Sequence, residues 1–141
     1  MLRAAFAALA ATGLGVERQS PVFDTPPLGP SRRRFANAAA VVACDEDPPG
    51  LLERLKGIES AFGRKGAGQR WRARVLDIDV ILWSGGAWAS HDLVIPHVEF
   101  RERPFVLAPA AAIAPAWRDP LTGFTLRQLH ARLTSPRPLP R

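Results

Sequence analysis

The chain has 141 residues, of which 47% are apolar, and its formal net charge is +6, with arginine supplying nearly all of the positive charge. This length fits one domain with a single core, which we expect over residues 1–134, followed by a proline-rich disordered tail at 135–141. The single cysteine, Cys44, excludes an internal disulfide, and no apolar run reaches the ~20 residues of a membrane-spanning helix. We therefore expect a cytoplasmic protein, and an arginine-rich charge suits phosphate groups.

The first part of the chain predicts one helix and then two strands. Apolar residues recur at helical spacing over residues 2–12. Residues 16–23 predict an extended strand, which Pro21 places at a sheet edge or a bulge because proline has no N–H to donate. A rigid loop at 25–30 follows, and residues 35–44 predict a more buried strand.

The middle of the chain contains the clearest helix and strand signals. Asp47 is a helix cap, and an apolar stripe runs from there to Gly63. The stripe consists of Leu51, Leu52, Leu55, Ile58 and Phe62. Residues 63–72 are glycine-rich and basic and predict a mobile loop, and residues 75–83 predict a strand.

The last part predicts helices joined by loops. Residues 91–97 predict a loop that leads into a short helical segment at 103–108. Thr125 and Gln128 have the spacing of a capping box, which predicts that the last helix begins there. The order of elements predicts an α+β, ferredoxin-like sandwich with a mostly antiparallel sheet under helices.

Two aspartates stand inside the predicted 75–83 strand. Because side chains alternate along a strand, Asp77 and Asp79 share one face and are about 6–7 Å apart. Carboxylates within an apolar strand are costly unless a cation compensates them, and Mg²⁺ prefers oxygen ligands together with substrate phosphates. A pairing of both aspartates with neighbouring arginines on a solvated face is the structural alternative.

Basic residues lie on both sides of this carboxylate pair. Upstream in the sequence are Arg64, Lys65, Arg70, Arg72 and Arg74. Downstream, His97 is followed by Arg101 and Arg103. A basic loop beside two carboxylates favours an ATP-consuming site, where positive charge meets the charge that develops on transferring phosphates. The pattern excludes two other nucleotide sites, since the chain has no GxxxxGK[ST] loop and no GxGxxG.

Six motifs, in this order and spacing, give the chain its resemblance to a known family. They are Thr25-Pro-Pro-Leu-Gly29, Phe35-Ala-Asn37, Ile58-Glu59 with Gly63-Arg64, Arg74-Val-Leu-Asp-Ile-Asp-Val80, Ile95-Pro-His97, and Arg103-Pro-Phe-Val-Leu-Ala-Pro109 with Ile113-Ala-Pro115. The chain resembles the 6-hydroxymethyl-7,8-dihydropterin pyrophosphokinases of folate biosynthesis over about residues 16–133. The resemblance implies Mg²⁺-dependent transfer of pyrophosphate from ATP to the pterin, with AMP released.

The resemblance also implies a role for individual residues. Asp77 and Asp79 would bind two Mg²⁺ ions, while Arg64 and Arg74 would steady the transferring phosphates. His97 and Arg103 would contact ATP. The residues implied for the pterin side are Thr25, Leu28, Phe35, Asn37, Trp71 and Phe105, with the ring between the two phenylalanines and Trp71 closing over the site with its loop. Neither nucleic acid nor a membrane is an implied partner, and we expect a monomer.

Three departures from the family pattern keep alternatives open. Arg72 replaces a usually small residue, and Gly66 replaces a residue that is often basic. Family members also begin with a strand ending in Gly-Ser-Asn, whereas this chain begins at the following helix, so we expect the reading frame to extend upstream into such a strand. The alternatives are an inactive paralogue lacking that strand and a basic, non-catalytic, ferredoxin-like module that binds nucleic acid.

Overall fold

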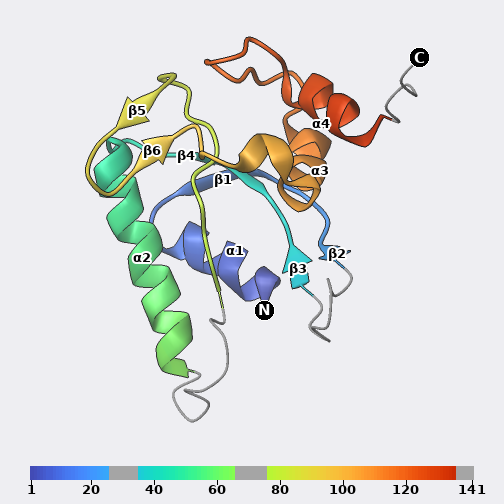
Figure 1. Ribbon diagram of the computed structural model, residues 1–141. Coiled ribbons are helices and arrows are strands. Elements are labelled where there is room, and N and C mark those ends of the chain that lie inside the picture. Colours follow the sequence, from blue (N-terminus) through green and yellow to red (C-terminus); the bar gives the residue numbers. More distant parts are fainter. Residues whose placement is uncertain (26–34, 66–75, 136–141) are drawn as a thin grey trace, which may run out of the picture.

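A computed structural model of the chain describes residues 1–25, 35–65 and 76–135 (Figure 1). Its helices are α1 (Leu2–Ala11), α2 (Pro48–Lys65), the short 3₁₀ helix η2 (Phe100–Glu102), α3 (Pro104–Ile113) and α4 (Leu126–Thr134). Its strands are β1 (Gly15–Gln19), β2 (Phe23–Thr25), β3 (Phe35–Asn37), β4 (Ala40–Ala43), β5 (Trp88–Ala89) and β6 (Val94–Ile95). Helices combined with antiparallel strand pairs confirm the α+β class. None of the described helices is both long and apolar enough to cross a bilayer.

Each of the first two predicted strands is divided in the structure. β1 pairs antiparallel with β4, and β2 pairs antiparallel with β3, so that the four strands form one long hairpin with an interruption. At the interruption, buried Ser20 donates its N–H to the carbonyl of Ala39 at 2.8 Å and accepts the N–H of Ala39 on its Oγ at 2.9 Å. The first predicted strand is interrupted around Pro21, where an edge or a bulge was expected because proline cannot donate to the ladder. The division of the second predicted strand after Asn37 was not predicted.

Helices cover both faces of this hairpin. In Figure 1, α1 and α2 lie on one side of β1 and β4, and α3 and α4 lie on the other. The first hydrophobic cluster joins α1 and α2 to the segment after residue 75. Its buried members are Ala5, Leu9, Leu14, Leu55, Ile58 and Leu76. The second cluster joins η2, α3 and α4 through Phe100, Leu107, Ala110, Ala114, Leu126 and Leu129.

Residues 76–82, called the 76–82 segment below, do not form the strand that was predicted at 75–83. It runs extended beside α2 (Figure 1), but no strand pairs with it among the described residues. Its side chains still alternate as far as Val80, since Leu76, Ile78 and Val80 face the first cluster. The alternation then ends, because Ile81 and Leu82 both pack against the second cluster. Apolar alternation therefore predicted the burial correctly but not the pairing, which needs a neighbouring backbone.

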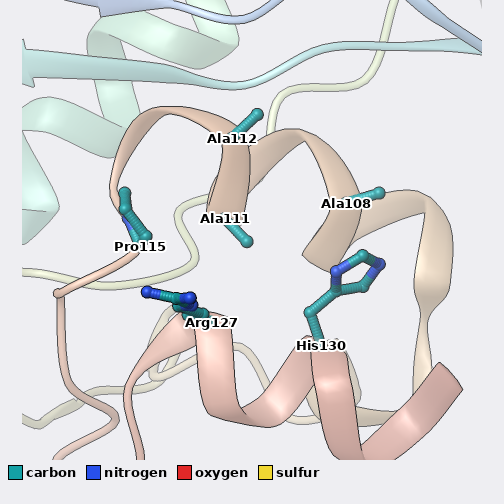
Figure 2. A pocket seen from close by; sticks show the side chains of 6 residues that line it. All are labelled: Ala108, Ala111, Ala112, Pro115, Arg127 and His130. Carbon is teal, nitrogen blue, oxygen red and sulfur yellow. The ribbon is translucent and has the colours of Figure 1, made fainter. Parts of the chain in front are cut away.

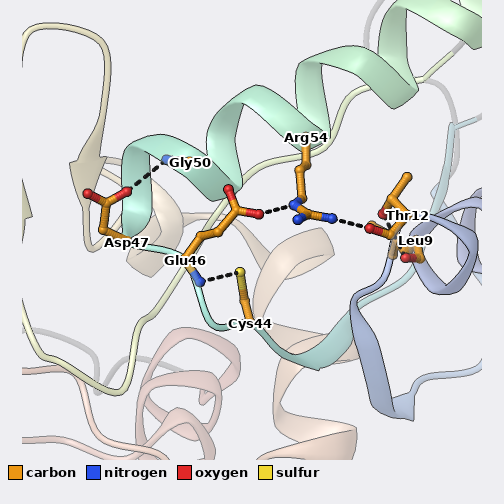
Figure 3. Close-up of polar contacts among 7 residues, drawn as sticks. All are labelled: Leu9, Thr12, Cys44, Glu46, Asp47, Gly50 and Arg54. Atoms are coloured by element: carbon orange, nitrogen blue, oxygen red, sulfur yellow. Dashed lines mark hydrogen bonds and ion pairs between the residues drawn. The ribbon is translucent and has the colours of Figure 1, made fainter.

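Cap and charge contacts define the start of α2 and join it to α1 (Figure 3). Asp47 Oδ1 accepts the N–H of Gly50 at 3.0 Å, which confirms the predicted cap. Arg54 donates to Glu46 Oε1 and to the carbonyl of Thr12, at the C-terminal end of α1, where a cation also complements the helix dipole. The helix continues to Lys65, so the predicted loop begins later than Gly63.

The C-terminal helices differ from the prediction in length. The predicted 91–97 loop contains β6, which pairs with β5, and the predicted 103–108 helix extends to Ile113 with Pro109 inside it. Pro109 removes one hydrogen bond, but it is fully buried, and neighbouring α3 residues pack against α4. The capping box is confirmed, since Gln128 N donates to Thr125 Oγ1 at 3.1 Å and Thr125 N donates to Gln128 Oε1 at 2.9 Å.

Candidate functional site

Asp77 and Asp79 lie on the exposed side of the 76–82 segment, away from the first cluster. Both residues are exposed, and the side chain of Asp79 retains 53% of its accessible surface. The expected common face is therefore present without a strand ladder. Two solvent-accessible carboxylates on one side of an extended segment form a donor set that suits Mg²⁺, which keeps several waters and shares substrate phosphates.

Glu59 of α2 fixes the backbone between the two aspartates. Its Oε2 accepts the N–H of Ile78 at 2.6 Å. Glu59 is four residues after Leu55 and next to Ile58, so it stands at the margin of the apolar stripe of α2. A carboxylate at the margin of an apolar stripe can reach the backbone of a segment packed against that stripe, and this position was the sequence feature that could have predicted the contact. This contact links α2 to the aspartate segment, and sequence analysis missed it.

His97 approaches the aspartates from the other side. Its backbone N–H donates to the carbonyl of Ile81 at 3.1 Å, which places the residue beside the 76–82 segment. Its Nδ1 accepts the N–H of Glu99 at 3.2 Å, and its Nε2 lies 3.9 Å from Asp79 Oδ2. Because Nδ1 is the acceptor, the neutral ring carries its proton on Nε2, facing Asp79. The structure thus brings together two residues that are 18 positions apart in the sequence.

Arg103 is the N-cap residue of α3 and lies close to two of its neighbours in the sequence. Its Nη2 donates to Glu99 Oε2, and its guanidinium carbon lies 5.7 Å from the centre of the Phe105 ring. Glu99 therefore contacts both of the expected ATP residues, through its backbone to His97 and through its carboxylate to Arg103. We call residues 97–103 the 97–103 turn.

The residues expected around the pterin come from different elements. Phe35 begins β3 and is 52% exposed, Asn37 ends the same strand, and Phe105 is half-buried on α3. Helix α3 contacts β3, so the two phenylalanines belong to neighbouring elements. An exposed aromatic ring on a strand and a second one on the helix beside it offer flat surfaces for a heterocycle.

Several predicted site residues cannot be placed. Leu28, Trp71 and Arg74 lie outside the described residues. Thr25 and Arg64 are described only through their backbones, at the end of β2 and near the end of α2. The roles expected for these five residues stay predictions.

A buried ion pair lies beneath the 97–103 turn. Arg101 donates from Nε to Asp119 Oδ2 at 2.5 Å and from Nη2 to Asp119 Oδ1 at 2.8 Å, and Asp119 is fully buried. These hydrogen bonds, helped by bonds from Thr122 and Leu121, lower the pKa of Asp119 from 3.8 to about 2, against the opposing effect of burial. Asp119 raises the pKa of Arg101 in return. Sequence analysis missed this pair because its members are 18 residues apart with no shared motif.

Surface hollows lie beside α3 and along the β5–β6 hairpin. The one in Figure 2 is between α3 and α4, and its lining includes Ala108, Pro115, Arg127 and His130. Another lies along the β5–β6 hairpin and is also lined by Val98 and Arg101 of the 97–103 turn. Neither is lined by Asp77 or Asp79, so the candidate site is a convergence of polar groups and not one of these hollows.

Comparisons with known proteins identify the family to which the chain belongs. Residues 1–115 match the family described as 7,8-dihydro-6-hydroxymethylpterin-pyrophosphokinase (HPPK). The chain belongs to this family. The resemblance seen in the motifs is thereby confirmed, and so is the assignment to a family of enzymes.

Named relatives extend this match along the chain. A Synechocystis protein named 2-amino-4-hydroxy-6-hydroxymethyldihydropteridine pyrophosphokinase is 39% identical over 91% of this chain and 66% of its own length. A protein of the same name from Methylorubrum extorquens is 42% identical over 94% of this chain and 84% of its own length. An Arabidopsis thaliana folate synthesis bifunctional protein is 40% identical over 69% of this chain, which spans only 20% of that protein.

Proposed function

We propose that this protein transfers pyrophosphate from ATP to 6-hydroxymethyl-7,8-dihydropterin in folate biosynthesis. Its membership of the HPPK family supports this activity. The structural observation that carries the proposal is the approach of His97 Nε2 to within 3.9 Å of Asp79 Oδ2. This approach brings Asp79, which is expected to bind the metal, close to His97, which is expected to contact ATP. Asp79 belongs to the 76–82 segment and His97 to the 97–103 turn.

Mg²⁺ is the metal that we propose for Asp77 and Asp79. Among the described residues, no group of three or more His, Cys, Asp and Glu side chains gathers to hold an ion. Two exposed carboxylates suit an ion that completes its shell with waters and phosphate oxygens, and two such ions are proposed here. When bound, Mg²⁺ would neutralise charge on the phosphates during in-line transfer.

The chain's own residues would orient the reactants. In the proposed reaction the pterin hydroxymethyl oxygen bonds to the β-phosphorus of ATP, the bond from that phosphorus to the bridging oxygen of AMP breaks, and the hydroxyl proton leaves to solvent. His97 and Arg103 would donate to the phosphates of ATP, and Arg64 and Arg74 would meet the charge that develops on the transferring group.

The pterin would lie between Phe35 and Phe105. Both residues are partly or largely accessible and belong to elements in contact. Thr25, Leu28 and Asn37 would read the edge of the ring, and Trp71 would cover it. We further propose that the protein works as a monomer in the cytoplasm, without nucleic acid or membrane as a partner.

The decisive experiment measures AMP formed by the purified chain from ATP, Mg²⁺ and hydroxymethyldihydropterin. We expect AMP only when all three are present, since the reaction consumes both substrates and needs the metal. AMP or ADP formed without the pterin would contradict the proposed transfer. Binding of Mg²⁺ and ATP without AMP formation would favour the inactive-paralogue alternative, and tight binding of single-stranded RNA would favour the nucleic-acid alternative.

A further inference from the structure

Asp119 stands at the centre of a closed loop between α3 and α4. Its backbone N–H donates to the carbonyl of Phe124 at 2.8 Å, and its carbonyl accepts the N–H of Gly123 at 2.8 Å. Its carboxylate accepts the N–H of Leu121 at 3.0 Å and the hydroxyl of Thr122 at 2.7 Å. The loop therefore holds the carboxylate in one orientation by contacts that do not involve Arg101.

Arg101 binds this preset carboxylate with two parallel hydrogen bonds. A guanidinium fork bound at both oxygens fixes direction as well as distance, which a single-point contact does not. Asp119 is fully buried, whereas the side chain of Arg101 keeps 25% of its exposure. Buried ion pairs often add little net stability compared with apolar side chains of similar volume. Stability alone is therefore a weak reason for a pair with this geometry.

What the fork orients is the 97–103 turn. Arg101 lies in η2, between His97 and Arg103 in the sequence. The turn is tied to the aspartate segment through the N–H of His97 and to α3 through the carbonyl of Arg103, which accepts from Leu107 N at 3.0 Å. The fork adds a third fixed point, on the α3–α4 loop. Rotation of the turn about its two ends is then blocked.

We propose that Asp119 is a positioning residue, which acts through Arg101 to hold the 97–103 turn so that His97 and Arg103 face the phosphates of ATP. This inference rests on the proposed function. The lowered pKa of Asp119 supports it, because the carboxylate stays ionised at every pH at which such an enzyme would work. Asp119 touches no reactant in this scheme.

The test compares four variants of the full chain by their Kd for Mg-ATP, their melting temperature and the NMR signals of the three histidine rings. Asp119→Asn removes the negative charge that the Arg101 guanidinium binds. Arg101→Lys replaces the two parallel hydrogen bonds of the guanidinium with a single ammonium contact. We expect both to weaken Mg-ATP binding about tenfold or more, since small misplacements of binding groups are costly. The His97 ring signals should shift, while those of His91 and His130 stay in place.

The double variant Arg101→Met with Asp119→Asn separates positioning from stability. It removes the buried charges together, so its melting temperature should recover relative to Asp119→Asn, but its affinity for Mg-ATP and its His97 signals should not. Asp92→Asn, at an exposed aspartate whose carboxylate contacts the ring of His91, is the control and should leave Mg-ATP affinity unchanged.

Two results would overturn the inference. One is recovery of wild-type affinity and His97 signals by the double variant, which would make the pair a packing element. The other is a folded Arg101→Lys variant that binds Mg-ATP as tightly as the wild type, because the fork would then be unnecessary. A wild-type chain that does not bind Mg-ATP would instead overturn the proposed function. In that case the His97 signals still decide whether Asp119 holds the turn.

Discussion

The two sides of the candidate site are held in different ways. The 76–82 segment carries Asp77 and Asp79 and has no paired strand among the described residues, and the backbone N–H between the aspartates is held by one side chain, Glu59. The 97–103 turn has bonds to Ile81, to α3 and to the buried carboxylate of Asp119. The 97–103 turn is thus preformed by bonds to three parts of the fold, whereas the backbone between the aspartates is held more loosely, by one described side-chain contact. Bound metal and phosphate would supply the missing restraint on the carboxylate side.

The largest expected effect follows from removing a carboxylate on the loosely held side. Asp79→Ala should lower AMP formation by ~10²–10³, because a charge-stabilising group is lost from the site. Its melting temperature should stay near that of the wild type, since Asp79 is exposed and lies outside both clusters. Asp92→Ala, at another exposed aspartate, is the control. Near-normal turnover by folded Asp79→Ala at saturating Mg²⁺ would contradict the metal assignment.

The second prediction concerns acid stability on the preformed side. The folded-state pKa of Asp119, about 2, is below its ordinary value of 3.8, so its contribution is complete above that value and is lost as the pH falls towards 2. The contribution is about 2 kcal/mol of unfolding free energy. Urea unfolding at about pH 5 and about pH 2 should show this loss in the wild type and not in Asp119→Asn. An equal pH dependence in both proteins would exclude Asp119 as its source.

A smaller effect is expected from Glu59, the contact that orients the backbone between the aspartates. Glu59→Leu removes the acceptor of the Ile78 N–H and should lower kcat about tenfold, because both carboxylates shift with that backbone. Glu53→Leu, at an exposed position of the same helix, is the matched control and should keep its kcat. Equal kcat for the two variants would mean that the 76–82 segment is fixed by its apolar contacts alone.

The smallest effect is expected at the start of α4. Thr125→Ala removes the acceptor of the Gln128 N–H and should lower the free energy of unfolding by ~1 kcal/mol. Thr134→Ala, at the other end of the helix, removes a hydroxyl that donates to a carbonyl already within the helix, and should change stability less. Thermal unfolding of both variants checks the difference. A larger loss for Thr134→Ala would show that the capping box is not what stabilises this helix.

The sequence by itself determined the features that depend on near neighbours. The caps at Asp47 and Thr125 use residues within a few positions of each other, so local patterns predict them. The motif order also predicted the family, which the comparisons confirm. The common face of Asp77 and Asp79 followed from alternation alone, which requires no knowledge of the rest of the fold.

Only the tertiary structure decided the features that join distant residues. It divided the predicted 35–44 strand after Asn37, left the 76–82 segment without a described strand partner, and kept Pro109 inside a helix that packs against α4. It also brought Asp119 to Arg101 and His97 to Asp79. Backbone pairing and buried ion pairs depend on which surfaces meet after packing, and no local propensity or spacing in the chain specifies that meeting.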